Sequence, residues 1–123
     1  MRPSRPFTAL TLSAGLLAST LASAGPAAAD GAKVFNLQCR TCHAAKSTVA
    51  GPSLSGVAGR RIAGLSDFAY SQALKGKGGV WTDSALDAYL AAPGKFAPGG
   101  RMITAVAAPA DRAAVIAYLK TLK

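Results

Sequence analysis

Both cysteines of this 123-residue chain and its single histidine fall within five consecutive residues, Cys39-Arg40-Thr41-Cys42-His43. The spacing Cys-x-x-Cys-His is typical of covalent haem attachment, because two thiols three residues apart can reach the two vinyl groups of a porphyrin. The imidazole of the next residue then faces the iron. The motif therefore predicts one haem c, bound covalently through Cys39 and Cys42, with His43 as an axial ligand.

Three other interpretations of the motif remain open, and each fits the sequence less well. A structural zinc site needs about four protein ligands, but the motif already contains every cysteine and histidine of the chain. A thioredoxin-like redox pair belongs at a strand-to-helix junction, and no stretch alternates apolar and polar residues for long enough to predict a strand. The third interpretation is a plain disulfide or two idle thiols.

One methionine is placed to complete the coordination of the iron. A six-coordinate haem needs a second axial ligand, and the chain has no second histidine. Met1 belongs to the expected leader, so the remaining candidate is Met102 in the loop APGGRM. A methionine that only fills a core gap usually lies on an apolar helix stripe. Because Met102 instead follows two Pro-Gly pairs, we predict that its thioether is the second ligand.

The residues beyond the leader are predicted to form helices joined by Gly- and Pro-rich loops, so the fold class is all-α. A chain of this size has a thin core, which a buried cofactor would complete. The helices are expected at these positions: a first helix capped by Asp30 and running into Cys39; a short helix from Ser66 or Asp67 to Lys75; a helix capped by Thr82 and ended by Pro93; and a last helix beginning near Pro109.

Residues 1–29 are expected to be a cleaved signal peptide. Arg2 and Arg5 precede an uncharged, apolar stretch that ends in small residues at Ala29, as export signals do. Cleavage after Ala24 and retention as a membrane anchor are the alternatives. We therefore expect residues 30–123 to form a single periplasmic domain, not inserted in the membrane after cleavage.

The charge of this domain suggests the kind of partner. Without Arg2 and Arg5 it has 12 basic residues against five acidic ones, a formal charge of +7. Export and the scattering of the basic residues argue against nucleic acid. We expect a monomer that meets acidic docking faces of redox proteins, steered by exposed charges such as Lys33, Lys46 and Lys95 together with Arg101.

Six blocks of the sequence resemble, in order, the blocks of class I cytochrome c, particularly the bacterial relatives of mitochondrial cytochrome c. They are GAKVFNLQCRTCH, GPSLSGVAGRR, DFAYSQALKGKGGVW, LDAYLAAP, PGGRM and VIAYLK. The resemblance extends over essentially all of residues 31–122. The resemblance implies four to five short helices wrapped around one covalently bound haem. It also implies that the N- and C-terminal helices pack together, with Gly31 and Phe35 against Val115 and Tyr118.

The resemblance further implies roles for residues around the haem. The Pro52 carbonyl would accept a hydrogen bond from the ring of His43, which orients the imidazole. Arg60, Tyr70 and Trp81 would hydrogen-bond the haem propionates. Tyr89 would lie beside Met102.

The chain departs from the family pattern close to these residues. Gly100 and Arg101 replace the Thr-Lys pair that usually precedes the methionine, so a hydroxyl near a propionate is lost. Leu74 and Ala92 replace asparagines common in mitochondrial forms, and Thr104 stands where an aromatic residue often shields the haem edge. We expect these changes to leave the ligands intact, while the reduction potential and partner docking need not follow those of the family, because hydrogen bonding and solvent access tune both.

A haem with both axial positions filled by protein has no site for oxygen or substrate. The predicted function is therefore one-electron transfer between respiratory or photosynthetic redox complexes, and the chain is not expected to be an enzyme. The alternative is a tightly bound haem subunit of a periplasmic dehydrogenase. A five-coordinate haem enzyme or gas-binding protein fits less well, because such proteins usually carry the haem motif near the C-terminus.

Overall fold

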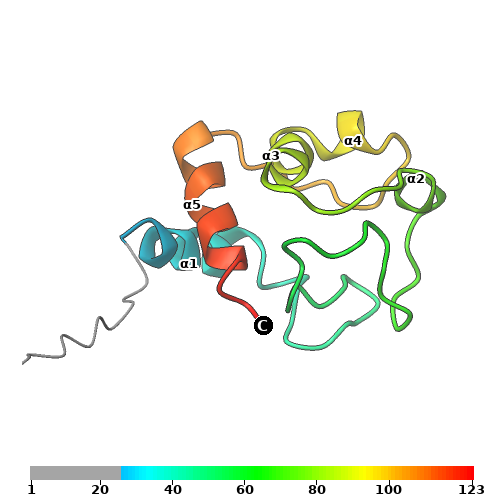
Figure 1. Cartoon of the computed structure of the whole chain (residues 1–123), viewed down its shortest axis with the longest axis horizontal. Coiled ribbons are helices and arrows are strands. Elements are labelled where there is room, and N and C mark those ends of the chain that lie inside the picture. Colours follow the sequence, from blue (N-terminus) through cyan, green and yellow to red (C-terminus); the bar gives the residue numbers. More distant parts are fainter. Residues whose placement is uncertain (1–25) are drawn as a thin grey trace, which may run out of the picture.

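Five helices follow one another along residues 26–123, the part of the chain that this computed structural model describes. They are α1 (Pro26–Gln38), α2 (Gln72–Lys75), α3 (Asp83–Ala91), α4 (Pro93–Phe96) and α5 (Pro109–Leu119). Figure 1 shows α1 and α5 crossing on one side and the three other helices grouped on the other side, with long loops closing the space below them. Within residues 26–123 the extended segments form one isolated bridge, between Arg61 and Val80, so the all-α prediction is confirmed.

The first and last helices pack tightly together, as the resemblance implied. Gly31 of α1 is buried so closely against α5 that a Cβ added there would lie 2.0 Å from the Ala114 carbonyl oxygen. One turn further along α1, the rings of Phe35 and Tyr118 lie 5.2 Å apart. The absence of a side chain at Gly31 thus sets how closely the helix that leads into Cys39 approaches α5.

Two of the expected helix starts are wrong. Asp30 does not cap α1, because the helix already begins at Pro26; proline suits a first helical position, and alanine, which follows it, is the strongest helix former. Residues 66–68 form a turn and a bend, residues 69–71 are irregular, and α2 begins only at Gln72, where Ser71 accepts a hydrogen bond from the amide of Leu74. Asp67 does not cap a helix, and its carboxylate accepts a hydrogen bond from Ser47 across the loop.

The later helix boundaries are confirmed, with one addition. Thr82 caps α3 by accepting from the amide of Ala85 at 3.1 Å, and α5 begins at Pro109. Pro93 follows the end of α3 but also opens α4, a four-residue helix that the sequence pattern did not predict. A proline can do both, because it cannot continue a preceding helix but fits the first turn of the next one.

The buried core lies where α3, α5 and the loops meet. Val57, Trp81, Leu86, Leu90, Val106, Val115, Ile116 and Leu119 form one cluster. Two ion pairs join α3 to α5 at its edge, Arg112 to Asp87 at 2.7 Å and Lys120 to Asp83 at 2.5 Å. At the end of the chain, the Leu122 carbonyl accepts a hydrogen bond from the amide of Gly56 at 2.9 Å, so the C-terminal segment is fastened to the loop that follows the cysteine motif.

None of the helices within residues 26–123 is long and apolar enough to cross a bilayer. The expected signal peptide, and its alternative as an anchor, fall almost entirely on residues 1–25 and so lie outside the described residues.

Candidate functional site

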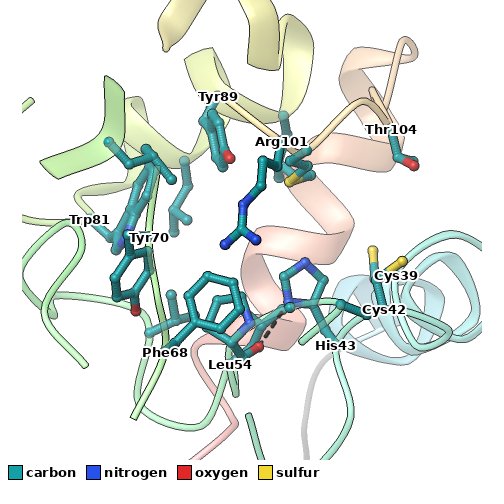
Figure 2. A pocket seen from close by; sticks show the side chains of 18 of the residues that line it. Cys39, Cys42, His43, Leu54, Phe68, Tyr70, Trp81, Tyr89, Arg101 and Thr104 are labelled. Atoms are coloured by element: carbon teal, nitrogen blue, oxygen red, sulfur yellow. Dashed lines mark hydrogen bonds between the residues drawn. The ribbon is translucent and has the colours of Figure 1, made fainter. Parts of the chain in front are cut away.

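One cavity of about 320 Å³ brings together the chemically distinctive residues of the chain. It lies between the cysteine motif, the long loops, α3 and α5, and its walls are mainly apolar. All nine residues singled out from the sequence line it: Cys39, Cys42, His43, Pro52, Arg60, Tyr70, Trp81, Tyr89 and Met102. Figure 2 shows the view into this pocket.

The cysteine motif forms one wall of the pocket directly after α1. The amides of Cys39 and His43 donate to the carbonyls of Phe35 and Cys39, both at 2.9 Å, so the chain continues in tight turns when the helix ends. Both cysteines are free thiols, Cys39 half-buried and Cys42 exposed, and Figure 2 shows both sulfurs on the same side of the pocket. Burial raises the pKa of the Cys39 thiol.

The imidazole of His43 is held by the following loop. Its Nδ1 lies 2.9 Å from the Pro52 carbonyl oxygen, which can only accept, so the proton lies on Nδ1 and Nε2 keeps a lone pair. Gly51 makes this approach possible, because a Cβ there would lie 2.7 Å from the Cys42 carbonyl oxygen and 3.1 Å from Nδ1. The loop therefore fixes the tautomer that can bind a metal through Nε2.

Arg60 lines the pocket as a half-buried cation whose hydrogen-bond donors are only partly satisfied. Its Nη1 and Nη2 donate to the carbonyls of Ser55 and Ser53, both at 3.0 Å. Its Nε is buried and has no hydrogen-bond partner within the described residues. A buried donor left unpaired costs roughly 1–3 kcal/mol, so this atom indicates that an acceptor belongs in the pocket.

Aromatic side chains form the wall that faces α3 and α4. The indole of Trp81 stacks near Tyr89 and Phe96, with ring centroids 5.1 Å and 5.7 Å away. Burial raises the pKa of the Tyr89 hydroxyl. The hydroxyl of Tyr70 accepts from the amide of Leu65 at 3.4 Å, which leaves its proton free to donate.

Met102 reaches the pocket from the loop between α4 and α5. The loop turns through Gly99, whose φ of +84° favours glycine, and the amide of Gly100 donates to the Ala97 carbonyl at 2.9 Å. Met102 is half-buried and packs against the core cluster. Its thioether is thus part of the pocket wall.

The residues that line the pocket have the chemistry that a haem c needs. Two thiols suit the vinyl groups, and an imidazole and a thioether suit the iron. The lining contains two arginines and no acidic residue, which suits the propionates. Within residues 26–123, no three His, Cys or Asp side chains lie together in a way that could hold a metal ion.

Sequence reasoning missed part of this site. Phe68 lines the pocket and packs edge-on against Tyr70 with centroids 4.9 Å apart. Arg101, which we expected only as a steering charge, also lines it. The signal in the sequence that could have identified Arg101 as a pocket residue is its position next to Met102. Of the positions that depart from the family pattern, Leu74 and Thr104 line the pocket as well.

Comparisons with known proteins find similar chains. Residues 28–123 match the family described as Cytochrome c. The cytochrome c of Tetrahymena pyriformis is 43% identical over 97 residues, covering 77% of this chain and 88% of that protein. The cytochrome c-type cyt cy of Rhodobacter capsulatus is 45% identical over 95 residues, covering 75% of this chain and 47% of that protein. Among solved structures, cytochrome cH from Methylobacterium extorquens superimposes with a TM-score of 0.71 at 40% identity, covering 76% of this chain and 97% of that one.

Proposed function

This chain belongs to the cytochrome c family, and from that premise we propose that it is a periplasmic one-electron shuttle whose haem iron is ligated by His43 and Met102. Proteins of this family bind haem c covalently through two cysteines, and Cys39 and Cys42 are the two in this chain. Members of this family are electron-transfer proteins and not enzymes, so this chain is a haem-based electron carrier.

The four proposed bonds to the cofactor come from both ends of the domain. Cys39 and Cys42 supply thioether links next to α1, while Met102 comes from the loop before α5. When bound, the haem supplies an iron that alternates between the ferric and ferrous states. Methionine ligation raises the potential of that couple relative to a second imidazole.

His43 is held in one orientation through its bond to Pro52. Because the carbonyl accepts the Nδ1 proton at 2.9 Å, the imidazole presents Nε2 and is a stronger base toward iron. Phe35 anchors the same segment through its carbonyl, which accepts from the amides of Cys39 and Arg40 at 2.9 and 3.0 Å. This wall of the pocket would change little between oxidation states, which keeps the reorganisation that accompanies electron transfer small.

The exposed charges support transient docking to acidic partners. Lys33, Lys46, Lys95 and Arg101 are all exposed, and charges of one sign steer the encounter with an oppositely charged face. The apolar leader that follows Arg2 and Arg5 supports export. Together these features favour a shuttle between membrane-bound redox complexes in the periplasm.

The single observation that carries the proposal is the lining of the pocket by the two cysteines, His43 and Met102. Its test is the variant Met102→Ala, with Asn36→Ala, an exposed position on α1 outside the pocket, as the control. Met102→Ala should keep the covalent haem, lose the low-spin spectrum and lower the reduction potential. The measurement is a redox titration with recorded spectra.

An unchanged spectrum and potential in Met102→Ala would refute the ligand assignment. Rapid binding of carbon monoxide to the reduced wild-type protein at neutral pH would instead show an open coordination position, and the carrier proposal would fail. Stable co-purification with a dehydrogenase would replace the shuttle by an enzyme subunit.

A further inference from the structure

Arg101 points into the pocket although its backbone lies on the surface loop. Its guanidinium lies over the ring of Phe68, with Cζ 5.1 Å from the centroid, and Nη2 donates to the Ala69 carbonyl. Figure 2 shows the guanidinium projecting toward the interior, on the side where Phe68 and Tyr70 lie. The side chain therefore crosses from the methionine loop to the segment that precedes α2.

The charges that line the pocket are unbalanced within the protein. Arg60 and Arg101 are the two arginines among the lining residues, which include no lysine and no acidic residue. Arg60 is half-buried and Arg101 is exposed, and an anion bound in the apolar pocket that both line would be stabilised by both charges. A haem brings two propionate carboxylates, so the pocket holds one arginine for each carboxylate.

The hydrogen-bond donors of Arg60 and Arg101 also fit two bound carboxylates. Arg60 has one buried donor, Nε, without a partner within the described residues. Arg101 uses Nη2 for Ala69, and its Nε and Nη1 make no hydrogen bond within residues 26–123. A guanidinium donates two parallel hydrogen bonds to one carboxylate through Nη2 and a neighbouring nitrogen, and Arg101 has the second Nη2 hydrogen available for such a pair beside its bond to Ala69.

We propose that Arg101 is the counter-charge of one haem propionate, in addition to the Arg60, Tyr70 and Trp81 donors at the same pocket. This inference rests on the proposed function, because it needs the haem. It also gives a reason for a departure noted in the sequence: Gly100 removes a hydroxyl near a propionate, and the neighbouring guanidinium supplies donors in its place.

A cation at this position affects the iron through space. Positive charge beside a propionate disfavours the ferric state more than the ferrous state, since the ferric haem carries one more positive charge. Arg101 therefore raises the reduction potential. It also lowers the pKa of the propionate, as an opposite charge at close range does.

The experiment compares the full-length, haem-loaded wild type with three variants. Arg101→Gln removes the charge, and Arg101→Lys keeps a charge without the planar fork. Lys95→Gln removes a charge from α4, the helix before the methionine loop, at an exposed position outside the pocket. The readouts are the low-spin spectrum, the midpoint potential at neutral pH and the dependence of that potential on pH.

The expected result is a lower potential in Arg101→Gln than in either the wild type or Lys95→Gln, with the low-spin spectrum retained in all. The pH region in which the potential changes should move upward by about one unit. Arg101→Lys should restore most of the potential, because the charge remains.

Two results would overturn the inference. The first is that Arg101→Gln has the same midpoint potential and the same pH dependence as Lys95→Gln. The loss of any nearby positive charge would then explain the change, without a specific contact to a propionate. The second is loss of the low-spin spectrum in both Arg101→Gln and Arg101→Lys. Arg101 would then hold the methionine loop in place and would not be the partner of a propionate. Neither result changes the outcome of Met102→Ala, so failure of this inference is distinguishable from failure of the proposed function.

Discussion

The tight crossing of α1 and α5 makes a clear prediction for Gly31→Ala. The new Cβ would lie 2.0 Å from the Ala114 carbonyl oxygen, 2.6 Å from its carbon and 2.8 Å from Cβ of Tyr118. The first of these contacts falls 1.4 Å short of the 3.4 Å at which ordinary van der Waals contact begins. Two of the three atoms belong to the backbone of a helix and have no rotamer by which to move away, so α1 itself must retreat.

The size of the effect is a balance of two terms. Overpacking typically costs about 1–3 kcal/mol, and the backbone contacts here place Gly31→Ala at the upper end or beyond. Replacing glycine by alanine inside a helix stabilises the helix by about 1 kcal/mol. We therefore expect a net loss of roughly 2 kcal/mol in the free energy of unfolding, accompanied by weaker contact between Phe35 and Tyr118.

The assay is guanidinium chloride unfolding of the haem-loaded protein, followed by the fluorescence of Trp81. Gly94→Ala is the matched control, because Gly94 also lies in a helix but a Cβ there would meet no atom within 4 Å. Gly94→Ala should leave the midpoint unchanged or raise it slightly. Equal midpoints for Gly31→Ala and the wild type would refute the claim that this glycine sets the distance between the two helices.

The remaining predictions concern the links between α3 and α5 and the alkaline range. Arg112→Ala should lower the free energy of unfolding by roughly 2 kcal/mol, because the side chain is 14% exposed and binds Asp87 and two backbone carbonyls. Lys120→Ala, which breaks a half-exposed pair, should cost less than about 1 kcal/mol, and equal losses in denaturant unfolding would contradict this ranking. Burial raises the pKa of Tyr89 above its ordinary value of 10.0, so its stabilising contribution is complete below pH 10.0 and is lost as the pH rises through the raised pKa. Tyr89→Phe should therefore lose stability less steeply in alkaline denaturant series, and parallel curves for variant and wild type would disprove the effect.

Much of the site could be predicted from the sequence because its chemistry depends on scarce residue types. With one histidine and two cysteines in a fixed spacing, few partners for a haem iron remain, and Met102 follows from counting. The proline loop could also be anticipated, since the resemblance to class I cytochrome c implies that the Pro52 carbonyl lies near His43. All of these residues line one pocket.

The parts that could not be predicted depend on contacts between segments distant in the sequence. Asp67 has the residue type of a helix cap, but its carboxylate binds Ser47, twenty residues earlier, so α2 starts later. The short helix α4 falls in a stretch rich in proline and glycine, where propensity favours a loop. Arg101 resembles any surface charge until its contacts with Phe68 and Ala69 are seen.

The pairing of α1 with α5 also affects the order in which the domain folds. Residues 109–119 provide the surface for Gly31, and the Leu122 carbonyl accepts the hydrogen bond from Gly56. Without α5 the cysteine motif lies at the end of a helix that has no partner, and a helix this short is marginal on its own. Because the two helices are far apart in the sequence, a long loop must close before they meet, which makes their contact a slow step of folding.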